Sequence, residues 1–246
     1  MVRLLTLLVL PLLTTCMVIT PSGLRPVVVI TFDDGHESIY TNAFRILSET
    51  SPTLPATHFL PTEWIDRPGM VTLKQLREME NRGWETGGHA SSHVNLPQLS
   101  PDSIRQQIGS CFRWLEAAGL RHESFAYPSG KYNDTVLSIA FEYFRNLRTA
   151  HDYHYTDGVN RREIGYFAVT QEHKAADIIA RIEEAETEGA PLVVIGFHAV
   201  LDDNGAGMSG SYYCRESVLR RLVSYLKTRE FQVMTIREAM NLLADN

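Results

Sequence analysis

The sequence lacks an excess of basic residues: 23 Lys and Arg stand against 29 Asp and Glu, for a formal net charge of -6. A nucleic-acid partner requires a basic surface, so this balance argues against one. Internal repeats, low-complexity tracts and long runs of one charge are missing as well, and the 11 prolines and 16 glycines are scattered. Nothing therefore marks a second domain, and 44% hydrophobic with 21% charged residues is ordinary for one globular domain with a full core.

A hydrophobic run long enough to span a membrane is also missing. The apolar stretch after Arg3 is short, and a basic head before a short apolar segment is typical of a secretory signal. We therefore predict a leader over residues 1–22, one domain over residues 23–246, and export to the periplasm, the cell surface or the medium. The end of the leader loosely resembles a bacterial lipoprotein cleavage box, so a lipid anchor at Cys16 would be the protein's contact with a membrane.

Cysteine is scarce, with three residues in the chain. Apart from Cys16, the two others are Cys111 and Cys214, which lie far apart in the sequence. They could form a disulfide in an oxidising compartment, but two unpaired thiols are at least as consistent with the spacing.

Short apolar runs alternate with segments of helical spacing along the whole chain, which predicts a parallel sheet with helices outside it. Seven or eight strands can be counted, and this number favours a barrel over an open sheet. We expect strands near 27–32, 56–60, 84–86, 124–127, 147–149, 167–169, 191–198 and 231–234. We expect helices over 40–47, 73–82, 101–118, 134–144, 175–188 and 218–226, and a last one from 236.

Polar residues follow the predicted strands. Asp33 and Asp34 end the first strand, His89 and His93 follow the third, and His198 ends the strand at 191–198. In barrels of alternating strands and helices, the active site gathers at the C-terminal ends of the strands. We therefore expect these side chains to converge, although loop acids and loop histidines without a function are the simpler interpretation of each one alone.

Two imidazoles four residues apart, at His89 and His93, face the same side of a helical turn and can share a metal ion. Together with Asp34 they offer two nitrogens and one carboxylate, a three-ligand set that leaves a position open for water. Such a set suits Zn²⁺, although other divalent ions accept the same ligands.

Four sequence motifs make the chain similar to the polysaccharide deacetylase family, also called carbohydrate esterase family 4 or the NodB homology domain. The segment 31–35, Thr-Phe-Asp-Asp-Gly, matches the first motif of this family. The segment 89–93 matches the second, with Ala90 where the family usually has Ser or Thr. The segments 125–130 and 193–198 resemble the third and the fifth motifs. The resemblance covers roughly residues 25 to 240 and implies an α/β fold, a distorted (β/α) barrel.

The resemblance also implies roles for individual residues. Asp33 would be the general base, His198 would protonate the departing amine, and a backbone N–H near Ser129 would contact the oxyanion. The ligands of the metal, most simply Zn²⁺, would be Asp34, His89 and His93. The substrate and oxyanion side would be formed by Tyr127, Pro128, Ser129 and Arg148.

The chain departs from the family pattern in two motifs. The family often carries an Arg in the third motif, paired with the catalytic Asp, and Ala126 occupies that position here. We hypothesise that Arg148, at the tip of the next strand, supplies this charge. The fourth motif, with Asp and Trp, is not evident, and Asp152 in that region could orient His198. Aromatic residues on predicted loops, Trp64 and Tyr212 among them, could stack on sugar rings or serve only for packing.

The sequence therefore predicts a metal-dependent N-deacetylase, active as a monomer on a glycan that contains N-acetylhexosamine. Two alternatives are an amidase that acts on a non-sugar N-acyl substrate and a catalytically silent glycan-binding barrel. Neither composition nor motifs identify the polymer or the metal.

Overall fold

A computed structural model describes residues 25–152, 155 and 158–244. The predicted leader and Cys16 lie outside these residues. No helix within the described ranges is long and apolar enough to cross a membrane. The two cysteines that are described, Cys111 and Cys214, are buried and not bonded to each other.

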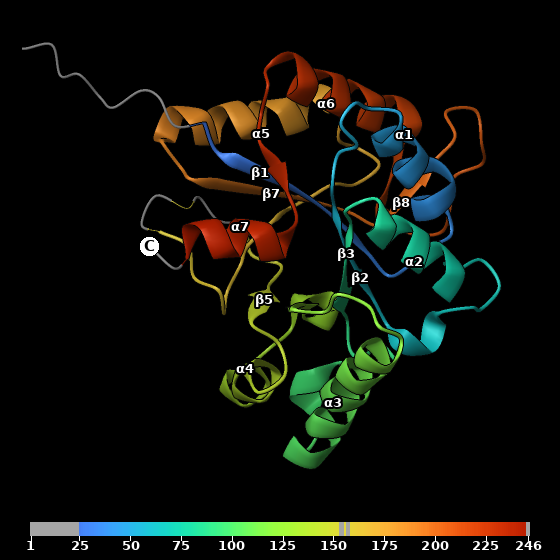
Figure 1. Cartoon of the computed structure of the whole chain (residues 1–246), viewed down its shortest axis with the longest axis vertical. Coiled ribbons are helices and arrows are strands. Elements are labelled where there is room, and N and C mark those ends of the chain that lie inside the picture. Colours follow the sequence, from blue (N-terminus) through green and yellow to red (C-terminus); the bar gives the residue numbers. More distant parts are fainter. Residues whose placement is uncertain (1–24, 153–154, 156–157, 245–246) are drawn as a thin grey trace, which may run out of the picture.

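The fold is built on an eight-stranded parallel sheet with β1 (Val27–Asp33) near its centre. Seven strands follow the order β5-β4-β3-β2-β1-β7-β6, and β10 pairs with the first half of β1. Figure 1 shows β1 and β7 running side by side through the middle of the molecule. The other strands are β2 (Thr57–Leu60), β3 (Glu85–Gly88), β4 (Ser124–Ala126), β5 (Asn146–Arg148), β6 (Phe167–Ala168), β7 (Leu192–Phe197) and β10 (Val233–Met234).

A short segment joins the two edges of the curled sheet. Ile164 forms a parallel bridge with Arg148 at the β5 edge, and its N–H donates to the Leu147 carbonyl over 2.9 Å. A few residues later, Phe167 of β6 pairs with Ile195 of β7. The sheet therefore curls into a distorted (β/α) barrel, and the fold class predicted from the sequence is confirmed.

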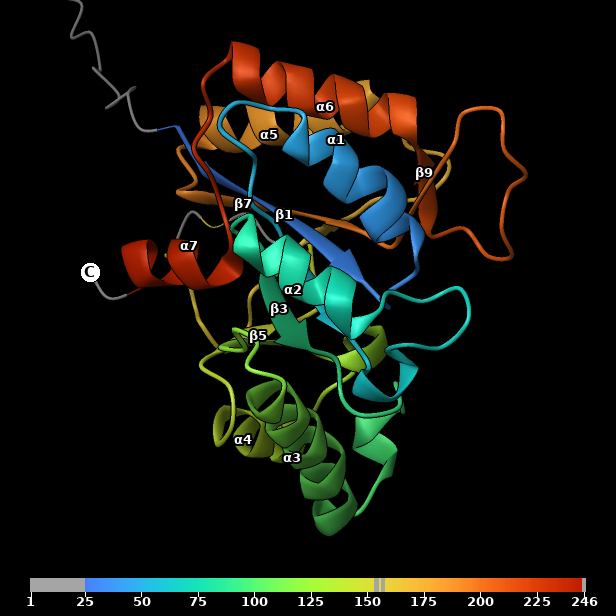
Figure 2. The same ribbon diagram turned by 45° about the vertical axis from the view of Figure 1, so that its right-hand side comes forward.

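The helices lie outside the sheet. Figures 1 and 2 show α5 and α6 side by side along one side of the molecule, with α3 and α4 together at the opposite end. A π-helical turn (Ile39–Phe44) leads into α1. The α-helices are α1 (Arg45–Ser48), α2 (Leu73–Asn81), α3 (Pro101–Ala117), α4 (Asp134–Phe141), α5 (Ala175–Glu188), α6 (Glu216–Thr228) and α7 (Ile236–Leu243).

Local sequence signals account for several helix ends. Thr72 accepts a hydrogen bond from the N–H of Gln75, whose side chain accepts one from the Thr72 N–H, so these two residues form a capping box. Ser100 caps α3 by accepting a hydrogen bond from the Ser103 N–H. Gly189 ends α5 in the left-handed conformation, with φ of 72°. These helix ends can be predicted from the sequence because the contacts that form them are between residues close together in the chain.

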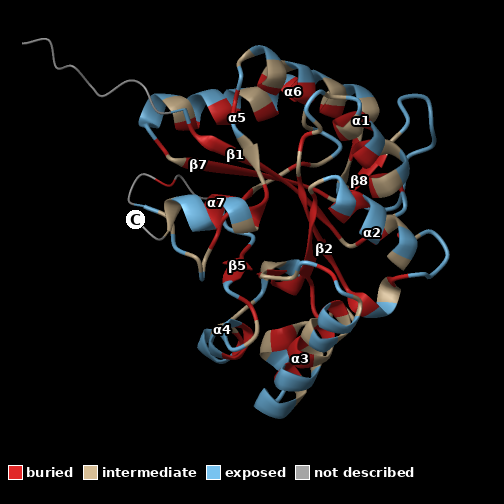
Figure 3. Cartoon of the chain, in the orientation of Figure 1, coloured by how far each residue is buried: buried red, intermediate tan, exposed pale blue. Residues whose placement is uncertain are grey.

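The core lies on both faces of the central strands. All seven residues of β1 are buried, and in Figure 3 β1, β2 and β7 are red along almost their whole length. On the outer face of β1, the Phe32 ring stacks on Trp84 and Phe197 at centroid distances of 5.3 and 5.5 Å. This packing holds the C-terminal tip of β1 firmly against its neighbours.

One pair of strands was not expected from the sequence. β8 (Ala199–Leu201) and β9 (Tyr213–Arg215) form a separate two-stranded parallel sheet after β7. Each strand is only three residues long, and its pairing depends on a partner more than ten residues away, which periodicity does not reveal. The loop between these strands reaches the site described next.

Candidate active site

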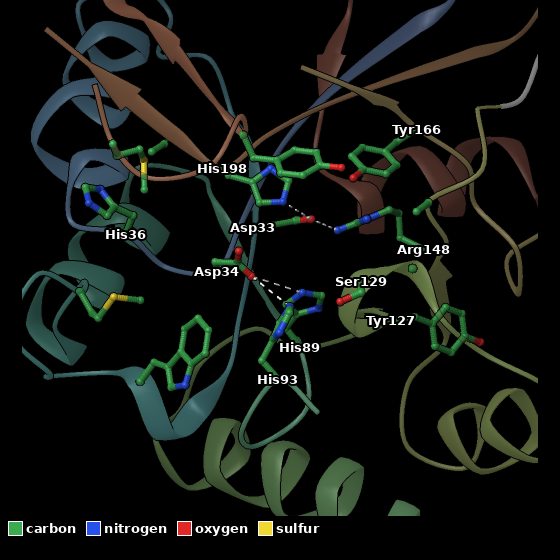
Figure 4. A pocket seen from close by; sticks show the side chains of 18 of the residues that line it. Asp33, Asp34, His36, His89, His93, Tyr127, Ser129, Arg148, Tyr166 and His198 are labelled. Atoms are coloured by element: carbon green, nitrogen blue, oxygen red, sulfur yellow. Dashed lines mark hydrogen bonds and ion pairs between the residues drawn. The ribbon is translucent and has the colours of Figure 1, made fainter. Parts of the chain in front are cut away.

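The end of β1 directs two neighbouring carboxylates to different partners. Neighbouring side chains of a strand point to opposite faces, but the chain leaves the strand at Asp34, whose φ is 70°, and at Gly35, whose φ is 79°. Asp33 remains inside the barrel and contacts Arg148, whereas Asp34 turns toward His89 and His93 (Figure 4). This turn at Asp34 and Gly35 therefore separates the two acids.

His89 and His93 lie in a tight turn after β3. We expected a helical turn, and this expectation is wrong, because Ala90 and His93 have φ values of 60° and 56°, in the left-handed region. The β2 side of the barrel holds this turn, since the N–H of Thr62 donates to the Ala90 carbonyl. The two imidazoles are nevertheless neighbours in an edge-to-face arrangement, with ring centroids 4.8 Å apart.

Three potential metal ligands converge at this point. Asp34 Oδ1 lies 3.6 Å from His89 Nε2 and 3.4 Å from His93 Nε2, and the three ligand atoms lie within 4.8 Å of one another. Among the described residues, Asp34 Oδ1 is buried without a hydrogen-bond partner. A buried carboxylate oxygen without a donor is costly, and a cation would satisfy it. The arrangement therefore fits a divalent metal ion.

His89 is oriented as a metal ligand. Its Nδ1–H donates to the Ala126 carbonyl over 2.7 Å, so the lone pair of the neutral ring is on Nε2, toward Asp34. Burial lowers the pKa of His89 to about 4, against the opposing effect of Asp33 and Asp34. The imidazole is therefore neutral at pH 7 and free to coordinate.

Asp33 forms a buried ion pair with Arg148. The guanidinium Nη2 donates to Asp33 Oδ2, and His198 Nε2 lies 3.9 Å from the same oxygen. Burial acts to raise the pKa of Asp33, but the neighbouring Arg148 and then His198 outweigh it, so the pKa lies below its ordinary value. Asp33 Oδ1 has no hydrogen-bond partner within the described part of the chain. An ionised carboxylate with one uncommitted oxygen can accept a proton.

Arg148 contacts Asp33 from β5, whereas the Arg of the family's third motif would lie on the neighbouring strand β4. Ala126, at the position of the family's motif-three Arg, pairs in register with Arg148 on β5. The guanidinium also contacts two rings: its Cζ lies 5.2 Å from the centroid of Phe59 and 4.2 Å from that of Tyr166. The structure thus contains the Asp33 contact that we hypothesised for Arg148.

Tyr166 had no role in the sequence analysis. Its ring occupies the space beside Gly196 on β7, where a Cβ would lie 2.0 Å from Tyr166 Cδ2. A glycine within a strong apolar strand often marks such a close approach, so Gly196 was the available signal. The sequence alone could not identify which ring fills that space.

The third-motif segment has one backbone N–H, that of Ser129, without a hydrogen-bond partner among the described residues. The Tyr127 N–H donates to the Arg148 carbonyl, the Gly130 N–H donates to the Tyr127 carbonyl, and Pro128 has none. The Ser129 N–H remains, at a residue with φ of 54° that lines the cavity. The Tyr127 hydroxyl is buried and points away from Asp34 in Figure 4. Of the predicted oxyanion residues, Ser129 therefore has the suitable N–H, and Tyr127 offers neither its N–H nor its hydroxyl.

His198 lies between β7 and β8 and borders the same cavity, which has a volume of about 610 Å³. The Tyr212 ring packs on His198 at a centroid distance of 4.7 Å. Asp152 does not orient His198, because its carboxylate pairs with Arg181 at 2.6 Å. The cavity is also lined by His36, Trp64, Met70, Gly130, Ala150, Ala199, Met208, Ser209 and Gly210.

Comparisons of sequence place the chain among known proteins. The family profile described as polysaccharide deacetylase matches residues 21–143, half of the 246 residues. A poly-beta-1,6-N-acetyl-D-glucosamine N-deacetylase of Staphylococcus aureus (strain MRSA252) is 30% identical over 125 residues, which covers 45% of this chain and 42% of that protein. The chain spans about two fifths of the length of the curated relatives it matches.

Solved structures share the fold. Wild-type BA3943 from Bacillus anthracis, described as a CE4 family pseudoenzyme, superposes with a TM-score of 0.59 at 20% identity, covering 88% of this chain and 66% of that one. The Streptococcus pyogenes deacetylase PplD, solved with acetate, has a TM-score of 0.56 at 24% identity and coverages of 63% and 69%. Because one of these proteins is a pseudoenzyme, the fold does not by itself establish activity.

Proposed function

The chain belongs to the polysaccharide deacetylase family, and on that premise we propose that it is a metal-dependent N-deacetylase of an N-acetylhexosamine-containing polysaccharide. The observation that carries this proposal is the convergence of Asp34, His89 and His93 beside the buried pair of Asp33 and Arg148. The polymer named for the Staphylococcus aureus relative, poly-beta-1,6-N-acetyl-D-glucosamine, is the first substrate to test.

The metal proposed for this site is Zn²⁺, held by Asp34, His89 and His93. One carboxylate oxygen and two imidazole nitrogens match a catalytic zinc site with three protein ligands and an open position. A divalent cation supplies Lewis acidity, which polarises the acetamide carbonyl and makes water more acidic. The neutral tautomer of His89, held by Ala126, supports this ligand role.

The remaining groups would transfer protons and stabilise the negative charge that forms on the carbonyl oxygen. Asp33 takes a proton from the water that attacks the acetamide carbon, and the Ser129 N–H donates to the carbonyl oxygen as it becomes negative. His198, within 4 Å of Asp33, donates a proton to the nitrogen as the carbon–nitrogen bond breaks. The products are acetate and a free amino sugar. An amide nitrogen is a poor leaving group without protonation, so the acid is required.

We further propose that the protein acts outside the cytoplasm. The support is the basic head and short apolar stretch of residues 1–22, which are typical of an export signal. A lipid anchor at Cys16 would keep the enzyme near its polymer. Fractionation of cells that express the full chain, with Cys16→Ser as the comparison, tests both statements.

Acetate release tests the proposed activity directly. The purified protein is expected to release acetate from N-acetylglucosamine oligomers, to lose this activity on dialysis against a chelator, and to recover it when Zn²⁺ is restored. Poly-N-acetylglucosamine, chitin oligomers and peptidoglycan are compared side by side. Glycan binding without acetate release would instead identify a silent glycan-binding barrel, and release from non-sugar N-acyl compounds alone would identify an amidase.

Two aromatic side chains flank the proposed reaction centre and fit a sugar chain. Trp64 lies 5.4 Å from the His93 ring, and Tyr212, which is 52% exposed, lies 4.7 Å from the His198 ring. In Figure 4, His93 and His198 lie on opposite sides of Asp34, so these aromatic rings border the site at two ends.

Removing either ring is expected to weaken binding of oligomers. For Trp64→Ala and Tyr212→Ala we expect KM for a hexasaccharide to rise about three- to tenfold with little change in kcat, because one aromatic contact contributes ~0.5–1.5 kcal/mol. Phe141→Ala is the matched control, since Phe141 is also exposed and does not line the cavity. An unchanged KM in both variants would show that these rings serve only for packing.

A further inference from the structure

The turn from His89 to His93 carries two of the three proposed ligands in a backbone conformation that is intrinsically unfavourable. Ala90 and His93 both have positive φ, in the left-handed region where the Cβ of a non-glycine residue crowds the following carbonyl oxygen. Ala90 is buried and has no polar side chain with which to stabilise the turn. The surroundings must therefore hold this conformation.

Gln107 on α3 makes the side-chain contacts that do so. Its Oε1 accepts hydrogen bonds from the Ser92 N–H over 3.2 Å and from the Ser92 hydroxyl over 3.1 Å. The backbone carbonyl of Gln107 accepts a third from the Ser91 hydroxyl over 3.0 Å. Ser92 immediately precedes His93, so one amide oxygen fixes the residue next to a proposed ligand.

The same face of α3 also supports the start of the turn. Cys111 lies one helical turn beyond Gln107, and its Sγ packs so closely on Gly88 that a Cβ there would lie 2.9 Å away. This end is held by close packing on a glycine. Toward His93 the turn is held by the polar contacts of Gln107 and by the Glu63 N–H, which donates to the Ser91 carbonyl over 2.9 Å.

We propose that Gln107 is a positioning residue of the metal centre: it holds the 89–93 turn so that His93 Nε2 faces Asp34. This inference rests on the proposed metal site but not on the substrate or on catalysis. Groups that orient metal ligands typically account for 10–100-fold in metal affinity. Gln107 lies 15 positions beyond Ser92 in the sequence and on a different element, so the motif itself does not reveal it.

The test compares metal affinity in three single variants of the full chain. We expect Gln107→Ala to weaken Zn²⁺ binding about 10- to 100-fold, measured by competition with a chromogenic chelator. Gln107→Glu keeps an acceptor oxygen and is expected to stay within about threefold of the wild type. Gln106→Ala is the matched control, because Gln106 is the exposed neighbour on the same helix and its removal should change nothing.

A spectroscopic readout separates positioning from general destabilisation. The Co²⁺-substituted wild type and the Gln107→Glu variant should share one ligand-field spectrum, and Gln107→Ala should show a changed one while its far-UV circular dichroism stays native. Equal Zn²⁺ affinity in Gln107→Ala and wild type would overturn the inference while leaving the proposed function intact. A wild type that binds no divalent metal would overturn both.

Discussion

Replacing Arg148 by alanine is expected to destabilise the protein by about 3–5 kcal/mol and to reduce deacetylation at neutral pH by at least about 100-fold. Arg148 and Asp33 are both almost fully buried, so the truncation leaves a carboxylate without a counter-ion inside the barrel. Its pKa would then rise, because burial would no longer be opposed by the guanidinium. A protonated Asp33 cannot act as a base. Urea unfolding and the pH profile of acetate release measure the two effects.

The ion pair of Asp33 and Arg148 should also affect how the free energy of unfolding of the wild type depends on pH. The folded-state pKa of Asp33 lies below its ordinary value of 3.8, so the unfolded chain takes up this proton first as the pH falls. The contribution of the pair is therefore fully present well above pH 3.8 and is lost as the pH drops through the folded-state pKa. We expect the free energy of unfolding to decline with acidification more steeply in the wild type than in an Arg148 variant.

Three further variants make the Arg148 prediction specific. Arg148→Lys retains a charge but lacks the planar group that lies over Tyr166, so an intermediate loss is expected. The double variant Asp33→Asn with Arg148→Met removes both charges and should be more stable than Arg148→Ala. Arg220→Ala breaks an exposed pair with Glu49 and should cost at most about 1 kcal/mol. Unchanged deacetylation in Arg148→Ala would refute the role assigned to Arg148.

Substitution of the two neighbouring acids is expected to separate chemistry from metal binding. Asp33→Asn should lower kcat by about 10²–10⁴, the usual contribution of a general base, and should keep Zn²⁺ affinity near that of the wild type. Asp34→Ala removes one of three protein ligands and should lower both Zn²⁺ affinity and activity, the former by more than about 100-fold. Each variant is measured by metal competition and by acetate release.

The two variants should have different effects because the side chains of Asp33 and Asp34 point in different directions at the end of β1. Asn at position 33 still offers an oxygen to Arg148, so the fold around it should persist, and circular dichroism checks this. Adding Zn²⁺ in excess is expected to restore part of the activity of Asp34→Ala and none of the activity of Asp33→Asn. Loss of metal from both variants to the same degree would contradict the assignment of Asp33 as a base outside the ligand set.

Much of the fold could be predicted from the sequence. The apolar run of β1, the capping box at Thr72 and the stop at Gly189 are encoded by residues that are close together, so a single pattern contains the information. The gathering of Asp33, His89 and His198 at one end of the barrel follows from the parallel order of the strands. The small β8–β9 sheet was missed because its pairing is not local.

The sequence by itself determined which strands carry carboxylates and imidazoles at their ends. The identity of each side chain and the hydrophobic periodicity of each segment are properties of the sequence itself. Only the tertiary structure decided how those groups are held. Ala90 and His93 adopt the left-handed conformation in their turn, Tyr166 fills the space beside Gly196, and Gln107 accepts hydrogen bonds from Ser92. The physical reason is distance along the chain: Arg148 and Asp33 are 115 positions apart, and such contacts form only after the barrel has curled.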